Sequence, residues 1–385
     1  MKKSKWRVFA AACIVFAGFC FLSAFFFLVL NDKIAANKDF IAYWTAGHRL
    51  AQGANPYDFE AVGEMERALG GSKLTVMRNP PDAFFLVLPL SLFSPKIGLI
   101  LWMMALLAAL SLSLWILWFL NGRPDNRVHL LGFLFAPALI CLLAGQIGIF
   151  LLLGVVLFLY LRPKRPFLAG AAILLCALKP HLFVSFFAVL LVWVVSRRAY
   201  RMVAGFLAAV LASCAFAFWL DAHAWSQYFH MMLHGGALDE PVPALSVALR
   251  FLINRQAVWL QFIPETLACV WALWYFWTRR NRWSWMDHGL LVLLVSVMCA
   301  PYCWITDEAV LLPAVLTGLY RVVESRRSVL PLGLVAGIAL IEFWVANVEI
   351  TTLYYLWTAP AWLAWYLFAC ASNRKQAVRP PAVPA

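Results

Sequence analysis

The chain has 385 residues, of which 64% are hydrophobic and 13% charged, and its mean hydropathy is +0.82. Soluble domains carry about 45–50% apolar and about 25% charged residues, so this composition excludes a water-soluble enzyme and a disordered chain. The net charge of +13 does not indicate nucleic-acid binding, because the basic residues stand in short clusters between apolar runs. The sequence therefore predicts an all-α, polytopic integral membrane protein.

The N-terminal segment is the first element expected in the membrane. A basic stretch from Met1 to Arg7 precedes an apolar run over 8–30. The apolar core of a cleaved signal peptide has about 7–15 residues, and this run is longer. We therefore expect a retained first span, with the N-terminus in the cytoplasm of a cell whose inner (plasma) membrane holds the protein.

The spacing of basic clusters predicts the remaining topology. Clusters of Lys and Arg recur along the chain, and by the positive-inside rule we place them all in the cytoplasm, so an even number of spans separates each pair of clusters. This gives about twelve spans, a transmembrane domain over 1–372 and a disordered cytoplasmic tail over 373–385. The predicted spans are 8–30, 96–120, two in 129–161, two in 167–196, then 202–220, 258–278, 286–300, 309–320, 329–346 and 353–370.

Two long loops remain outside the cytoplasm, over 31–81 and 221–257. In the first, aromatic and small residues at helical spacing predict a helix over 39–52 that lies in the membrane interface, followed by a second helix over 59–69 capped by Asp58. The apolar segment 81–93 is too short to span, so we expect a re-entrant or buried short helix.

The candidate functional residues lie on this outer side. Asp39 is explained either as the N-cap of the first helix or as a catalytic carboxylate, and the residues alone favour the cap. Lys179 and His181 flank a proline at a hairpin turn, where an ammonium and an imidazole either bind a lipid phosphate or, for the lysine, reach the interface. Gln146 either binds a hydroxyl-rich ligand or ties its own hairpin together.

Other polar residues admit structural explanations. Asp307 and Glu308 begin a span, where the helix dipole stabilises acids. His230 and His234 are four residues apart, but the sequence supplies no third ligand, and the nine cysteines contain no C-x-x-C pair. We therefore predict no metal or other cofactor, although outer-side acids leave a divalent cation possible.

Several strings resemble the membrane glycosyltransferases of family 87. The most specific is DFIAYWTAGHRLAQGANPYD over 39–58, followed by NPPDAFFLVLPLSLFSP over 79–95 and Trp102. Weaker matches are AGQIGIFLLLG at 144–154, LKPHL at 178–182 and APYCWITDEAVLLPA at 300–314. The resemblance covers about residues 36 to 320.

The resemblance implies a GT-C fold and transfer of a sugar, typically mannose, from a polyprenyl-phosphate donor to a glycolipid or glycan outside the cytoplasmic membrane. It maps the catalytic base onto Asp39. We expect Lys179, with His181 or Arg250, to bind the donor phosphate. Further substrate contacts are expected from Tyr43, Trp44, Tyr57, Asp58, Gln146 and Asp307, although the residues alone favour interface anchoring for the three aromatic side chains. The alternative function is a lipid or glycan flippase of the cell envelope.

Overall fold

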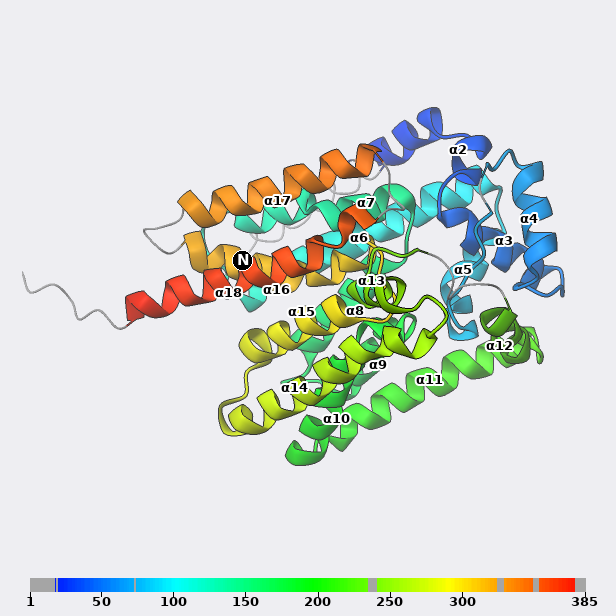
Figure 1. The fold of residues 1–385 in the computed structure, drawn as a ribbon. Helices are drawn as coiled ribbons and strands as arrows, with labels where there is room; N and C mark the ends of the chain where they lie inside the picture. Colours follow the sequence, from blue (N-terminus) through cyan, green and yellow to red (C-terminus); the bar gives the residue numbers. More distant parts are fainter. Residues whose placement is uncertain are drawn as a thin grey trace, which may run out of the picture. The chain divides into compact units, whose positions relative to one another are not determined.

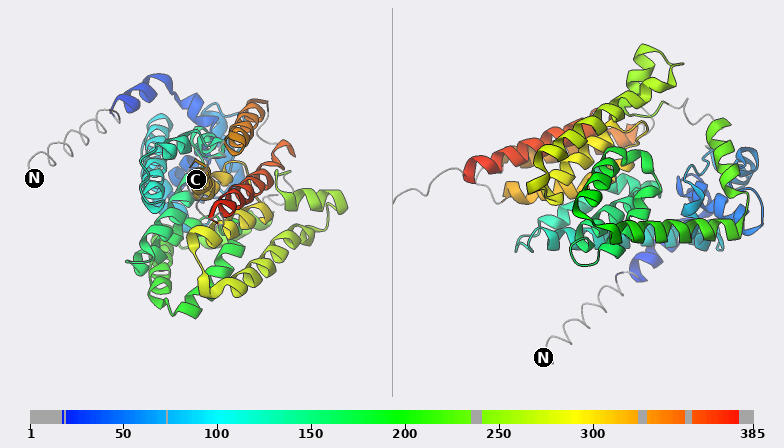
Figure 2. Two further views of the ribbon diagram at one scale, coloured as in Figure 1. Left: turned by 90° about the vertical axis from the view of Figure 1, so that its left-hand side faces the viewer. Right: turned by 90° about the horizontal axis from the view of Figure 1, so that it is seen from below.

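The computed structural model describes residues 18, 20–72, 74–234, 241–323, 329–348 and 353–377. Every regular element in these ranges is a helix (Figures 1 and 2), which confirms the predicted all-α class. The chain divides into two compact units. The first comprises 1–108, 143–145 and 213–235, and the second comprises 109–142, 146–212 and 236–385.

The first unit contains the predicted outer-loop helices. α3 packs against both α4 and α5. The approach of α3 to α5 depends on Gly47, because a Cβ at that position would lie 3.0 Å from the Val87 carbonyl oxygen. The described helices of this unit are Cys20–Val29, α2 (Asp32–Ala36), α3 (Phe40–Ala51), α4 (Phe59–Ala68), η1 (Pro81–Ala83), α5 (Phe84–Ser91), the first part of α6 (Pro95–Leu120), the last part of α11 (Tyr200–Leu220) and α12 (Ala224–His234).

The second unit is built mainly from short helices that pack in pairs. α8 packs on α9, α10 on α14, and α16 on α18. Its helices begin with η2 (Val128–Leu134), α7 (Ala136–Ala144), α8 (Gly148–Leu161), α9 (Pro166–Ala177), η3 (Pro180–Leu182) and α10 (Val184–Arg197). They continue with α13 (Leu245–Ile253), η5 (Val258–Phe262), α14 (Ile263–Arg279), η6 (Arg280–Arg282), η7 (Trp285–Gly289), α15 (Leu290–Cys299), η8 (Asp307–Leu311), α16 (Leu312–Val323), α17 (Val329–Val348), η9 (Leu353–Tyr355) and α18 (Thr358–Ala377).

These helices coincide with the predicted spans, but most are short. Among the described residues, two helices, α6 and α11, are long and apolar enough to cross a membrane. The consecutive helices α9 and α10 have 12 and 14 residues. At about 1.5 Å per residue, each is shorter than a hydrocarbon core of about 30 Å. The number of twelve spans stays a prediction, and the first part of the first span, residues 8–17, lies outside the described residues.

Local signals in the sequence explain where helices begin and end. Asp58 accepts a hydrogen bond from the Ala61 amide at 3.2 Å and so caps α4, as predicted. Pro166 occupies the first turn of α9, where its missing N–H costs nothing. The segment 81–93 forms η1 and α5, the short helix that we expected.

Two expectations about elements are wrong. α3 does not present its aromatic side chains to lipid headgroups, because Phe40, Tyr43 and Trp44 are buried inside the first unit. α18 extends to Ala377, five residues into the predicted tail 373–385, where the sequence SNRKQA contains several good helix formers; the rest of that tail lies outside the described residues.

Candidate active site

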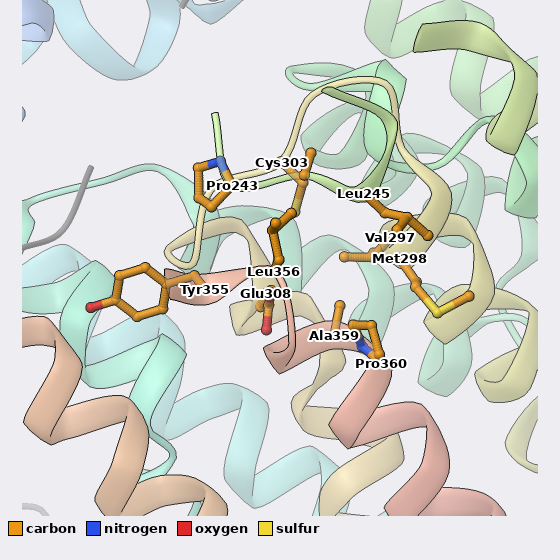
Figure 3. Close-up of a pocket in the computed structure, with 11 residues that line it drawn as sticks. Pro243, Leu245, Val297, Met298, Cys303, Glu308, Tyr355, Leu356, Ala359 and Pro360 are labelled. Carbon is orange, nitrogen blue, oxygen red and sulfur yellow. The ribbon is translucent and has the colours of Figure 1, made fainter. Parts of the chain in front are cut away.

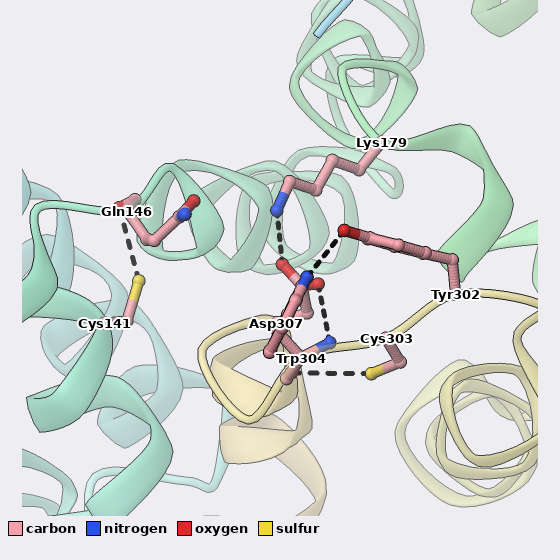
Figure 4. A network of polar contacts seen from close by, with 7 residues as sticks. All are labelled: Cys141, Gln146, Lys179, Tyr302, Cys303, Trp304 and Asp307. Carbon is pink, nitrogen blue, oxygen red and sulfur yellow. Dashed lines mark hydrogen bonds and ion pairs between the residues drawn. The ribbon is translucent and has the colours of Figure 1, made fainter. Parts of the chain in front are cut away.

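An ion pair joins two distant segments of the second unit. The Lys179 ammonium lies 2.6 Å from Oδ1 of Asp307, and the two side chains are 12% and 0% exposed (Figure 4). Lys179 directly precedes η3, and Asp307 begins η8. Removing two charges from water costs several kcal/mol each, and close pairing offsets that cost. The structure thus brings together two residues that the sequence named for different roles.

The second oxygen of Asp307 is fixed by the backbone. The Trp304 amide donates to Asp307 Oδ2 at 3.0 Å, and the Trp304 indole N–H donates to the Tyr302 hydroxyl at 2.7 Å (Figure 4). Asp307 therefore has one oxygen on the ammonium and one on a main-chain amide. Its orientation is set by its own segment, so the carboxylate can hold Lys179 in one position.

His181 lies beside this pair but is not a second cation. Its ring meets the Tyr302 ring edge-on at 5.7 Å, and its Nε2 atom is buried without a hydrogen-bond partner among the described residues. Burial lowers the pKa of His181 to about 4, against a smaller opposing effect of Asp307. The imidazole is therefore neutral at pH 7, and it offers a hydrogen bond rather than a charge.

The Gly-Gln-Ile-Gly turn packs against the start of η8. The Gln146 amide N–H donates to the Cys141 carbonyl at 2.9 Å, and the Cys141 thiol donates to the Gln146 carbonyl at 3.2 Å. A Cβ at Gly148 would lie 2.5 Å from the Thr306 carbonyl oxygen, so only glycine fits there. In Figure 4 the amide end of Gln146 points toward the side on which Lys179 lies. The main chain of Gln146 ties its hairpin, and its side chain is directed to the ion pair.

Arg250 is turned toward protein groups. It is 1% exposed, and it donates to the Arg255 carbonyl at 2.7 Å and to the Gln261 side chain at 3.1 Å. The Gln261 amide in turn donates to the Pro301 carbonyl, directly before Tyr302. Through Gln261, Arg250 thus holds the segment that leads to Asp307. The sequence alone did not disclose this contact.

Two further carboxyl groups are buried near this segment. Glu308 accepts a hydrogen bond from Thr358 at 2.5 Å, and Glu342 accepts one from the Trp362 indole at 2.8 Å. The buried Glu342 carboxyl is therefore held by Trp362. Glu308 also lines a small, mostly apolar cavity together with Cys303 and Tyr355 (Figure 3).

Asp39 belongs to the first unit, and it does not cap α3. Its backbone is already helical, with φ −59° and ψ −21°, and its side chain makes no capping hydrogen bond. A capping residue is normally extended and accepts from an amide of the first turn. The capping explanation, which the sequence favoured, is therefore wrong, and the partly exposed carboxylate of Asp39 keeps its catalytic interpretation.

The predicted aromatic contacts of the first unit form a packed cluster. Tyr43 lies 5.3 Å from Trp102, whose indole N–H donates to the Gly145 carbonyl at 2.7 Å. Trp44 stacks on His48 at 4.7 Å and donates to the Phe93 carbonyl at 3.0 Å. These rings are buried, so they do not anchor the chain in the membrane interface, and their substrate-binding roles stay predictions.

Tyr57 and Asp58 are also engaged within the first unit. The Tyr57 hydroxyl donates to the Asn79 carbonyl at 2.9 Å. Asp58 caps α4, and its second oxygen lies 3.4 Å from the Arg49 guanidinium. Both residues therefore stabilise the first unit through these contacts, and their substrate-binding roles stay predictions.

Sequence reasoning missed Asp82 and Glu66, both buried acids of the first unit. Asp82 follows Asn79-Pro80-Pro81, and its Oδ1 atom has no hydrogen-bond partner among the described residues. Glu66 accepts hydrogen bonds from the Thr75 amide at 2.8 Å and the Thr75 hydroxyl at 3.3 Å. A charged residue directly after two prolines could have identified Asp82 from the sequence. The sequence of α4 is typical of an exposed helix, so it gave no indication that Glu66 is buried.

Metal-binding geometry is not found in the part of the chain that the structure describes, where no three His, Cys, Asp or Glu side chains form a group. The rings of His230 and His234 stack at 4.4 Å, and His234 Nδ1 lies 2.9 Å from the His230 carbonyl oxygen. The two histidines thus interact with each other along α12.

Comparison with known protein families gives a match over much of the chain. The sequence model of glycosyltransferase family 87 matches residues 78–301, more than half of the chain. The matched region contains Gln146, Lys179, His181 and Arg250, but Asp39 and Asp307 lie outside it. No curated protein and no solved structure matches this chain.

Proposed function

Because the chain belongs to glycosyltransferase family 87, we propose that it transfers a sugar from a polyprenyl-phosphate donor to a glycolipid or glycan acceptor. The proposed sugar is mannose, and the proposed reaction takes place on the extracytoplasmic side of the plasma membrane. The buried Lys179–Asp307 pair is the observation that carries the donor assignment. It fixes an ammonium, the group that binds a phosphate oxygen as a point charge, at a turn between two apolar helices.

The proposed step is a single inverting displacement. The acceptor hydroxyl oxygen attacks the anomeric carbon while Asp39 takes the hydroxyl proton, and the bond from that carbon to the phosphate oxygen breaks. The electron pair of that bond leaves with the polyprenyl phosphate. Lys179 stabilises the negative charge that develops on the leaving oxygen, and neutral His181 adds a hydrogen bond.

The pairing with Asp307 decides how Lys179 acts. The pair has no net charge, so it offers little long-range attraction to a phosphate. It instead holds the ammonium in place, and a preorganised donor stabilises a developing charge without the cost of reorganising at the moment of reaction. We therefore assign Asp307 to positioning Lys179, in place of the direct substrate contact expected from the sequence.

The predicted topology favours a lipid-linked sugar as the donor. The cytoplasmic loops predicted from the basic clusters are short, and the sequence contains no G-x-x-x-x-G-K-[ST] or G-x-G-x-x-G loop that would cradle a nucleotide phosphate. The candidate residues all lie in the loops and turns assigned to the opposite face. A nucleotide sugar made in the cytosol would be on the wrong side of the membrane for them.

The test is a transfer assay with the purified chain in lipid nanodiscs. Radiolabelled polyprenyl-phosphate mannose and a membrane lipid extract are supplied, and a nucleotide-linked mannose replaces the donor in a parallel sample. Label in a new glycolipid or glycan from the lipid donor alone is the expected result. In proteoliposomes, movement of the intact donor across the bilayer without a covalent product would support the flippase instead.

A further inference from the structure

The first unit contains a carboxylate with no assigned role. Asp82 is the second residue of η1 and is 6% exposed, and its Oδ1 atom is buried without a partner among the described residues. A buried polar atom that makes no hydrogen bond costs free energy, which a ligand donor recovers on binding. Burial raises the pKa of Asp82 to about 6, so the group is still largely ionised at pH 7 and remains a strong acceptor.

Two tyrosines from separate segments gather at the same place. The Tyr57 and Tyr228 rings lie 5.5 Å apart, and α12, which carries Tyr228, packs against η1, which carries Asp82. Burial raises the pKa values of both phenols, and the Asp82 charge adds a smaller increase to each. The carboxyl and the two rings therefore form one cluster, to which η1, α12 and the loop before α4 each contribute one side chain.

The two tyrosines are not equivalent. Tyr57 is 3% exposed, its hydroxyl is used by the Asn79 carbonyl, and its ring also stacks on Phe84 at 6.0 Å. Tyr228 is only partly buried. Tyr57 thus serves as a fixed support, while Tyr228, whose phenol is within electrostatic range of the Asp82 carboxyl, is the more accessible of the two rings.

This combination matches the chemistry of a sugar ring. Sugar hydroxyls donate to a carboxylate oxygen and accept from a phenol, and the C–H face of the ring packs on an aromatic side chain. We infer that Asp82, Tyr57 and Tyr228 form a binding subsite for a hydroxyl-rich sugar ring, an inference that rests on the proposed function. Asp82 accepts a sugar hydroxyl, Tyr228 donates to a neighbouring one, and Tyr57 positions Tyr228.

Direct binding tests the subsite without a transfer step. The full chain in nanodiscs is titrated calorimetrically with octyl α-D-mannopyranoside below its micelle concentration, and 1-octanol measures the contribution of the alkyl chain. We expect Asp82→Asn to weaken glycoside binding at least ten-fold, because a charge-assisted hydrogen bond becomes a neutral one. Tyr228→Phe should weaken it several-fold, and Glu64→Gln, an exposed acid on α4, should not change it.

The stability of the variants separates binding from folding. Asp82→Asn removes a buried charge, so we expect its melting temperature to equal or exceed that of the wild type. Lost binding at unchanged stability supports the subsite. Equal affinity of Asp82→Asn and wild type, or no difference between the glycoside and octanol for the wild type, overturns it.

The transfer assay then identifies the source of the sugar ring. A raised KM for the acceptor with an unchanged KM for the donor assigns the subsite to the acceptor, and the reverse result assigns it to the donor. If transfer proceeds with both KM values unchanged in Asp82→Asn, the subsite is wrong while the proposed function stands. If the wild type binds the glycoside but transfers nothing, the subsite stands and the proposed function fails.

Discussion

At the residue scale, the chemistry of Asp39 can be separated from its position in the fold. Because its side chain makes no capping hydrogen bond, the carboxylate is not needed to begin α3. Asn keeps the size of the side chain, so we expect Asp39→Asn to retain the fold while kcat falls by about 10²–10⁴-fold, the usual contribution of a general base. Initial transfer rates and thermal unfolding check this, and wild-type rates in the variant would remove Asp39 from the base role.

The Lys179–Asp307 pair makes a sharper prediction, because its two functions respond differently to mutation. Breaking a buried pair leaves an uncompensated charge and costs about 3–5 kcal/mol, so Lys179→Met alone should lower the melting temperature strongly. The double variant Lys179→Met with Asp307→Asn removes both charges and should regain most of that stability. It should not regain transfer, because the leaving phosphate still lacks its ammonium.

Both properties are measured on the same preparations, as melting temperature and initial rate at saturating donor. Conservative Lys179→Arg keeps the charge and tests whether the position of the ammonium matters. Recovery of transfer in the double variant would show that the pair is structural and that the phosphate is bound elsewhere.

Glu66 predicts a pH dependence of stability. Burial raises its pKa from 4.5 to about 7, against the opposing effect of its Thr75 hydrogen bonds. Between these values the folded state binds the proton more tightly than the unfolded state, so this group makes the free energy of unfolding fall as pH rises from about 4.5 to 7. Gln resembles the protonated acid, so Glu66→Gln should match the wild type at pH 4.5 and be more stable at pH 8. A melting-temperature difference that does not change with pH would contradict this.

At the element scale, glycines set how closely α9 and α11 approach. A Cβ on Gly170 would collide with the Met202 carbonyl oxygen, and one on Gly205 with the Phe167 carbonyl oxygen. Both obstacles are backbone atoms, so the helices themselves would have to move.

We therefore expect Gly170→Ala and Gly205→Ala each to cost about 1–3 kcal/mol. Gly337→Ala in α17 is the matched control, because nothing lies within 4 Å of a Cβ there. It should be neutral or slightly stabilising. The melting temperature and the yield of monodisperse protein in detergent measure these effects. Equal melting temperatures and yields for the three variants would contradict the close packing of α9 and α11.

Charge clusters and apolar runs predicted most of the helices, because both signals are local. α2 and α13 were missed, since each is a short helix within a polar loop. The burial of Tyr43 and Trp44 could not be predicted, because it depends on tertiary packing within the first unit. The pairing of Lys179 with Asp307 was equally inaccessible, because 128 residues separate them and each has a satisfactory local explanation.

At the scale of the whole molecule, the proposed reaction requires that the Asp39 loop and the Lys179 turn open on the same side of the membrane. Asp39 lies in the first unit, and Lys179, His181 and Asp307 lie in the second. The predicted topology assigns both regions to the extracytoplasmic face because the basic clusters flank them in an even-span arrangement. A single reaction centre fails if that assignment fails.

Cysteine accessibility in intact cells tests this most directly. Gln52→Cys marks the end of α3, Val184→Cys marks the start of α10 beside the Lys179 turn, and Asn281→Cys marks a basic cluster. All three positions are exposed, and the parent chain gives the labelling background. A membrane-impermeant maleimide should label positions 52 and 184 in intact cells and position 281 only after permeabilisation. Labelling of 52 and 184 from opposite faces would contradict the shared centre and, with it, the proposed transferase mechanism.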